Sequence, residues 1–446
     1  MKQQSNFLRC NIVSSALVLG LMMLSVTACT AIKPGRLIPI SSGHSYLIMI
    51  DETAPSNAQV RLSLASAPVR LSIARNGDGA AISRVTCADG RAAAFDGLSW
   101  VAPPDCREFT WNVALEGIDH TGIDASLPVA SYSLNHRYWL LPERGAFLRA
   151  ANSGGMVKTT LRLKGGRTIV TNLMFPSADQ PPYYAVIGSE PQQEYSSSEL
   201  RLRVFGKPPQ YPWMNALHND VLARWAIWRR DLSSGKAPSV IDWVWVEVPP
   251  DAAPGYSASA GSEAIISQIK LRPGDPDAEA KARVVIGTSA AHEGFHTITG
   301  AAGQAWPAWV NESLANHYAI TAAQAFLEPE DQKWLDVFYI AREVRTPLLN
   351  AQSRYTAGDG DQAQVFYTYG ARFWRKIESI LTIDSNGSGR LAALIAASNN
   401  FSDIDLNSAN ELASFLDLHS DGKAGPIVRC FLIDENCAVG TERSTH

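Results

Sequence analysis

The sequence shows no excess of charge of either sign, because 39 basic and 43 acidic residues leave a formal net charge of −4. Nucleic-acid binding usually needs a basic face, and a polybasic membrane patch needs clustered Lys and Arg, so neither class of protein is favoured. Internal repeats and low-complexity segments are absent. The P-loop, GxGxxG and GxSxG motifs are absent as well, which argues against the common nucleotide-binding folds and the serine hydrolases.

Cysteine is scarce, with six residues and no CxxC spacing, so the sequence does not resemble a zinc knuckle. Hydrophobic residues make up 46% of the 446 positions, an ordinary share for a globular protein. This length suits two or three domains, each large enough to bury a core.

The first 28 residues predict a lipoprotein signal peptide. Lys2 and Arg9 precede an apolar stretch over 12–28, which is marginally short for a transmembrane helix and ends in small residues. The segment V-T-A-C, ending at Cys29, resembles a bacterial lipobox. That resemblance implies acylation of Cys29 and membrane anchoring through it, with 29–36 as a tether. A transmembrane helix and a plain cleaved signal are the alternatives.

Thr30 follows the lipobox cysteine, where an Asp would suggest retention at the inner membrane. By resemblance to such lipoproteins, we expect an exported protein anchored in the outer membrane and facing the periplasm. No partner other than this membrane is indicated by these features, and the oligomeric state stays open.

Four cysteines remain outside the signal and the anchor, an even set in an exported chain. An oxidising compartment makes disulfides plausible. Four cysteines allow three connectivities, and proximity in sequence favours Cys87–Cys106 and Cys430–Cys437. Free buried thiols are the alternative.

Residues 37–206 predict an all-β domain, either a β-sandwich or a saddle-shaped sheet. Short apolar runs alternate with polar residues and are broken by Gly, Pro, Asn and Asp, which is the period of half-buried strands; examples are 60–64, 69–73 and 200–204. Residues 207–212 contain three prolines and predict a linker.

Residues 213–446 predict an α+β domain. Apolar residues at helical spacing indicate a helix over 213–230, and apolar runs indicate strands at 243–248, 264–271 and 283–286. Helices are expected to dominate from 290 to 397.

The motif that carries chemistry is HExxH, formed by His292, Glu293 and His296. On a helix, residues i and i+4 share one face, so both imidazoles can reach one metal ion. Glu293 can then take a proton from a metal-bound water. With nine histidines in the chain, chance would produce this motif in only about one such sequence in a hundred.

A second amphipathic helix is expected to begin at Trp309 and to carry Glu312. The residues between His296 and Glu312 leave room for the end of one helix, a Gly-containing loop and the start of the next. Antiparallel packing would bring Glu312 to the metal. Two histidines and one carboxylate leave a fourth position for water, the open geometry of catalytic zinc.

HExxH followed by a W-x-N-E helix resembles the gluzincin metallopeptidases, and most of all the M1 and M61 aminopeptidases. Trp309 begins the segment W-V-N-E-S-L-A, which is similar to the M1 pattern W-L-N-E-G-F-A, although the connecting segment is shorter. The resemblance implies a thermolysin-like catalytic domain with one zinc ion per chain. It also implies His292, His296 and Glu312 as ligands and Glu293 as general base.

The function expected is therefore a zinc-dependent peptidase of the cell envelope, with a peptide or protein as its substrate. The alternative is an inactive scaffold or binding protein on the same fold, but the intact Glu293 speaks against it.

The resemblance also implies a tyrosine that supports the oxyanion. Tyr367 matches it, and its phenol is the kind of donor that this role needs. The other interpretation is that Phe366, Tyr369 and Phe373 form a core stripe beside which Tyr367 merely lies. Tyr369 and Tyr355 are the reserve candidates.

The G-x-M-E-N motif of M1 enzymes is absent, and because few residues follow Tyr367 we do not expect their long C-terminal helical domain. Gly261-x-Glu263 is a faint echo of the former, so Glu263 is a weak candidate for substrate binding. Exopeptidase and endopeptidase action both stay open. For Asn316, one turn after Glu312, one alternative is a role in supporting the metal ligands, but we expect it to be solvated or to cap a helix.

Overall fold

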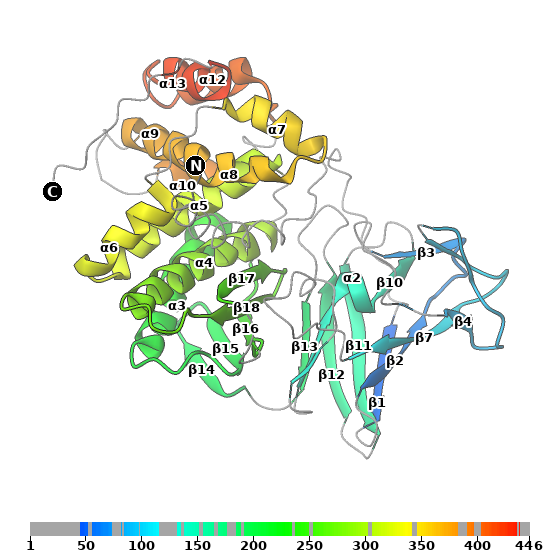
Figure 1. Ribbon diagram of the computed structural model, residues 1–446. Coiled ribbons are helices and arrows are strands. Elements are labelled where there is room, and N and C mark those ends of the chain that lie inside the picture. Colours follow the sequence, from blue (N-terminus) through cyan, green and yellow to red (C-terminus); the bar gives the residue numbers. More distant parts are fainter. Residues whose placement is uncertain are drawn as a thin grey trace, which may run out of the picture.

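The computed structural model is drawn in Figure 1. The residues it describes are 45–51, 56–73, 82, 84–97, 99–115, 132–134, 138–150, 155–164, 168–175, 184–188, 191–233, 237–248, 253–301, 306–340, 346–381, 390–396, 403–434 and 437. The predicted signal peptide, tether and lipid-anchor cysteine lie outside them. Among the helices described, none has the length and apolar character needed to cross a membrane.

The first half of the described chain is almost entirely β-structure, as the alternating pattern predicts. One sheet has the order β12-β11-β1-β2-β7-β4, a second β10-β3-β6-β5 and a third β13-β9-β8. All pairings in these sheets are antiparallel except that of β1 with β11. The strands are β1 (Ser45–Asp51), β2 (Asn57–Ser63), β3 (Arg70–Ile73), β4 (Thr86–Cys87), β5 (Ala94–Phe95), β6 (Ser99–Val101), β7 (Glu108–Ala114), β8 (Tyr132–Leu134), β9 (Tyr138–Pro142), β10 (Leu148–Ala150), β11 (Gly155–Lys164), β12 (Thr168–Phe175) and β13 (Tyr184–Gly188).

Period-two burial explains why these segments form strands. In β1, β2 and β7 every second side chain is buried, and the residues between them are partly or fully exposed. The buried set includes Ile48, Val60 and Trp111. A short helix, α2 (Glu143–Ala146), interrupts the strands, and the Ala146 carbonyl accepts a hydrogen bond of 3.0 Å from Trp111 Nε1.

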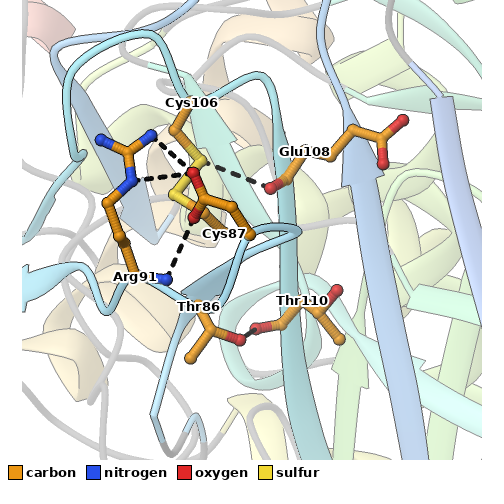
Figure 2. Close-up of a disulfide and its surroundings, with 7 residues drawn as sticks. Thr86, Cys87, Arg91, Cys106, Glu108 and Thr110 are labelled. Atoms are coloured by element: carbon orange, nitrogen blue, oxygen red, sulfur yellow. Dashed lines mark hydrogen bonds and ion pairs between the residues drawn. A yellow bond between two sulfur atoms is a disulfide. The ribbon is translucent and has the colours of Figure 1, made fainter.

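Both predicted disulfides are confirmed. Cys87 lies in β4 opposite Phe109 of β7, so Cys106, two residues before the start of β7, comes within reach of it (Figure 2). The Cα atoms of Cys87 and Cys106 are 6.0 Å apart, and those of Cys430 and Cys437 are 5.0 Å apart. Both separations lie in the range that a disulfide spans.

The second half is built on a five-stranded sheet of order β14-β15-β16-β18-β17. Its strands are β14 (Gln193–Ser196), β15 (Arg201–Gly206), β16 (Val240–Trp245), β17 (Gly255–Ala260) and β18 (Ala264–Lys270). The central strands β15, β16 and β18 are parallel, and the edge strands β14 and β17 are antiparallel to their neighbours. The predicted strands at 200–204, 243–248 and 264–271 are confirmed within this sheet.

The predicted linker, 207–212, does not separate the two halves. Strand β15 pairs with β16, so it belongs to the sheet of the second half. The proline-rich segment therefore connects β15 to the first helix of that same unit. The sequence pattern could not predict that β15 belongs to the second half, because β15 has the same alternation of apolar and polar residues as the strands before it.

Helices cover one face of the five-stranded sheet and the β-rich half covers the other. Trp243, Trp245 and Ile265 pack into the large core formed with the helices. Val244 and Ile266, on the opposite face, pack against Tyr184 of β13 and its neighbours. In Figure 1, β13 correspondingly lies beside this sheet. Burial on both faces explains the continuous apolar runs of β16 and β18.

The helical part contains α3 (Met214–Ser233), α4 (Ala278–Ala301), α5 (Ala308–Phe326), α6 (Pro329–Leu335), η4 (Asp336–Ile340), α7 (Leu348–Thr356), η5 (Gly360–Gln362), α8 (Ala363–Val365), η6 (Phe366–Gly370), α9 (Ala371–Leu381), α10 (Arg390–Ala396), α12 (Ala409–Asp417) and α13 (Ala424–Leu432). The strand predicted at 283–286 is wrong, because this segment is the second turn of α4. Val284 and Ile286 are both fully buried, in two different clusters. A helix buried on two sides has the same short apolar run as a buried strand.

Candidate metal centre

Helix α4 carries the HExxH motif, and its geometry places the two histidines together. His292 and His296 lie one turn apart, with ring centroids 4.7 Å apart and rings nearly perpendicular. Both side chains are largely buried, at 11% exposure. Their Nε2 atoms are 3.0 Å apart, so both point to one place.

Helix α5 brings Glu312 to the same place, as its distance from HExxH predicts. Glu312 Oε2 lies 3.3 Å from His292 Nε2 and 3.4 Å from His296 Nε2. Tetrahedral zinc, with ligands at about 2.0–2.1 Å, requires donor atoms about 3.3 Å apart. The three donors therefore fit a zinc ion. Among the described residues, this is the one such cluster of His, Cys, Asp or Glu.

The short distances between Glu312 and the two imidazoles shift the pKa values of Glu312 and His296. Burial alone would raise the pKa of Glu312, but the charge of His296 and hydrogen bonds from both imidazoles hold that pKa far below its ordinary value. Burial lowers the pKa of His296, yet the charge of Glu312 raises it overall. The carboxylate is therefore ionised at neutral pH and presents a negative charge to a cation.

Glu293 lies beside the three donors. Burial raises its pKa above the ordinary value, while the two imidazoles and a hydrogen bond from the backbone N–H of Ala260 act in the opposite direction. Ala260 is the last residue of β17, so the carboxylate of Glu293 is held between the HExxH helix and the edge strand of the sheet.

Tyr367 also reaches the cluster. It lies in η6, a single π-helical turn, with its ring 5.6 Å from that of His292. Its hydroxyl hydrogen-bonds to Glu312, and burial followed by the charges of Glu312 and Glu293 raises its pKa well above the ordinary value. The phenol is therefore protonated at neutral pH and can act as a donor.

The neighbours of Tyr367 form the core stripe that was the other interpretation. Phe366 and Phe373 are fully buried, and Tyr369 stacks on Phe431 with ring centroids 4.6 Å apart. Tyr355 packs edge-on against Phe366. The core stripe is thus confirmed, and it packs η6 in place, while the ring of Tyr367 lies beside that of His292.

Two supports of Tyr367 were not found in the sequence. A Cβ atom on Gly370 would lie 2.5 Å from the Cβ of Ser313, so only glycine lets η6 approach α5 so closely. Asn316 is buried and donates a hydrogen bond to the carbonyl of Tyr367, so the expectation of a solvated or capping Asn316 is wrong. The π-turn itself is a feature frequent at functional sites, but the sequence carries no simple signal for it.

Gly294, inside HExxH, also allows two elements to approach closely, in this case helices α3 and α4. A Cβ atom there would lie 1.9 Å from Nε1 of Trp225 in α3. The motif's third residue therefore sets the contact between α3 and α4, and through it the position of both histidines.

Glu263 lies in the turn between β17 and β18, next to the HExxH helix. Its carbonyl accepts a hydrogen bond of 3.0 Å from the backbone N–H of Asp242. The same turn contains Gly261, whose carbonyl accepts one from Thr297 of α4. The structure thus brings Glu263 to the end of β17 that also holds Glu293.

Comparison with known proteins shows a likeness of fold. No protein-family model matches the chain, and no curated protein sequence matches it. An aminopeptidase N family protein from Idiomarina loihiensis superposes with a TM-score of 0.59, covering 88% of this chain and 76% of that one at 11% identity. An M1 zinc metallopeptidase from Deinococcus radiodurans covers 87% and 93%, with a TM-score of 0.44 and 12% identity. The first of these shows that the chain has a fold of the aminopeptidase N type.

The donor geometry predicts about one zinc ion per purified chain. His296→Ala removes one of three protein ligands, so its zinc content should fall to near zero by elemental analysis. His317→Gln is the control. His317 lies on α5 five residues after Glu312, and it pairs with Glu378 at 2.8 Å and not with the three donors. The assignment would be contradicted if His296→Ala kept the zinc content of the wild type. It would also be contradicted if His317→Gln lost its zinc while His296→Ala kept it.

Proposed function

We propose that this protein is a zinc-dependent peptidase that hydrolyses peptide bonds with a metal-activated water. The observation that carries the proposal is the convergence of His292, His296 and Glu312 at zinc-ligand spacing, with Glu293 directly beside them. The aminopeptidase N-type fold supports it. A binding or scaffold protein would have no use for a buried carboxylate at that position.

When bound, zinc would supply Lewis acidity that lowers the pKa of a water ligand toward about 7. Glu293 would take the proton from that water and pass it to the leaving amine. Burial raises the pKa of Glu293 above its ordinary value, which makes the carboxylate a stronger base. The N–H of Ala260 would keep the carboxylate aimed during the transfer.

Tyr367 would stabilise the oxyanion that develops on the substrate carbonyl. Its hydroxyl hydrogen-bonds to Glu312, and it can turn that hydrogen toward new negative charge close by. A donor already in place costs little reorganisation during the reaction.

The substrate would be an extended peptide running along β17. This strand is the last in its sheet, so one of its edges is unpaired within the sheet and can accept a further strand. Glu263, at the end of β17, would offer a carboxylate to a positively charged group, and a free amino terminus would suit it. We therefore favour aminopeptidase-like action over internal cleavage.

Glu293→Gln separates a catalyst from a scaffold. It keeps the size of the side chain but removes the base, and Glu293 is not among the three donors, so zinc content and melting temperature should stay near those of the wild type. Cleavage of a peptide library, followed by mass spectrometry, should fall by at least about 100-fold. The loss should appear in kcat more than in KM.

Tyr367→Phe should lower kcat by less than Glu293→Gln, since one oxyanion donor contributes at most about 10²–10³-fold. Tyr369→Phe is the matched control from the same turn and should cleave like the wild type, because its ring stacks on Phe431. Undiminished cleavage by Glu293→Gln would sink the mechanism. A wild type that binds zinc but cleaves nothing in a broad library would favour the scaffold alternative.

We further propose that the protein is exported and held at the outer membrane by acyl chains on Cys29. The lipobox-like segment V-T-A-C supports this, and each buried methylene of an acyl chain would contribute about 0.8 kcal/mol to anchoring. Cys29→Ser cannot be acylated in the same way, so fractionation should find that variant released from membranes. Retention in the membrane fraction after a salt wash would contradict the anchor.

A further inference from the structure

Strand β17 matters to the proposed chemistry because its last residue, Ala260, binds the carboxylate of Glu293. Both faces of the strand are in contact with other parts of the chain. Its side chains alternate, as in any strand. Tyr256 and Ala258 pack into the core beneath the helices. Ser257 and Ser259 therefore point to the opposite face, toward the β-rich half.

On the helix side, two contacts tie the end of β17 to the HExxH helix. The N–H of Ala260 donates to the carboxylate of Glu293. Thr297, fully buried one turn after Glu293, lies with its Oγ1 3.0 Å from the carbonyl oxygen of Gly261. The position of β17 thus determines where the Glu293 carboxylate is held.

On the other side, a side-chain contact reaches β17 from the N-terminal half. The hydroxyl of Tyr184 in β13 lies 2.8 Å from Oγ of Ser259, within hydrogen-bond distance. Tyr184 is only 1% exposed, and its ring packs among Leu140, Val244 and Ile266. The phenol is therefore rigidly placed by the interface between the two halves.

We propose that Tyr184 is a positioning residue, through which the N-terminal β-rich half holds the strand that aims the general base. Ser259 directly precedes Ala260 in the strand. Any movement of Ser259 therefore also displaces the backbone N–H of Ala260, which binds Glu293. The edge strand has one neighbouring strand in its sheet instead of two, and face contacts must supply the remaining restraint. This inference rests on the proposed peptidase function.

Tyr184→Phe tests it, since the change removes the hydroxyl and leaves the packed ring. We expect kcat for a cleaved peptide to fall by about three- to tenfold, the effect of losing one positioning hydrogen bond. Zinc content should not change. Ser259→Ala should give the same loss, Ser259→Thr should retain activity because it keeps a hydroxyl, and the Tyr184→Phe/Ser259→Ala pair should lose no more than either single variant.

Tyr46→Phe is the matched control. The Tyr46 hydroxyl is also buried and donates a 2.7 Å hydrogen bond, but to the carbonyl of Leu148 inside the β-rich half. It should lower the melting temperature about as much as Tyr184→Phe while leaving kcat unchanged. Equal kcat values for the two Phe variants would overturn the proposal and leave the peptidase function standing.

Amide hydrogen exchange gives a second readout that does not depend on turnover. Peptides covering 255–262 should exchange faster in Tyr184→Phe than in Tyr46→Phe. Equal exchange in the two variants would overturn the positioning role. A wild type without peptidase activity would instead overturn the proposed function, and with it the kinetic role of Tyr184.

Discussion

The site depends on one electrostatic constraint, which is that the carboxylate of Glu312 is buried between two imidazoles. An ionised carboxylate away from water is costly unless opposite charge and hydrogen bonds compensate it. His292, His296 and the hydroxyl of Tyr367 lie against that carboxylate, and a bound zinc ion would add the positive charge that compensates it. Helices α4 and α5 and the turn η6 must therefore meet at fixed positions, and the surrounding core is arranged to make them do so.

Small residues stand where those elements approach most closely. Gly294 lets the HExxH helix lie against Trp225, and Gly370 lets η6 lie against Ser313. Trp374 Nε1 then donates a hydrogen bond of 2.7 Å to Ser313 Oγ, which ties α9 to the same contact. Close packing of this kind resists small shifts, so the three donors stay at the spacing that a metal ion would need.

Much of the site could be predicted, because its residues are specified by local spacing. HExxH places two of the three donors on one helix face, and the W-x-N-E segment supplies the third donor at a distance that one loop can span. The disulfides were predictable for the same reason, since each joins cysteines close in sequence.

What could not be predicted depends on tertiary pairing. The run at 283–286 has the composition of a strand, but burial on two sides makes it part of a helix. Strand β15 has the alternation of the first half but pairs with β16 of the second. Asn316 is polar yet buried, because it binds a carbonyl 51 positions further along the chain. None of these partners is visible from a local window of sequence.

The central claim is that three side chains of this chain hold a zinc ion and leave one position open to water. Zinc K-edge X-ray absorption of the purified protein tests it most directly. The account predicts a first shell of nitrogen and oxygen only, at about 2.0–2.1 Å, with about two imidazoles contributing to the outer scattering. Sulfur ligands at about 2.3 Å, or a shell of four imidazoles, would contradict it.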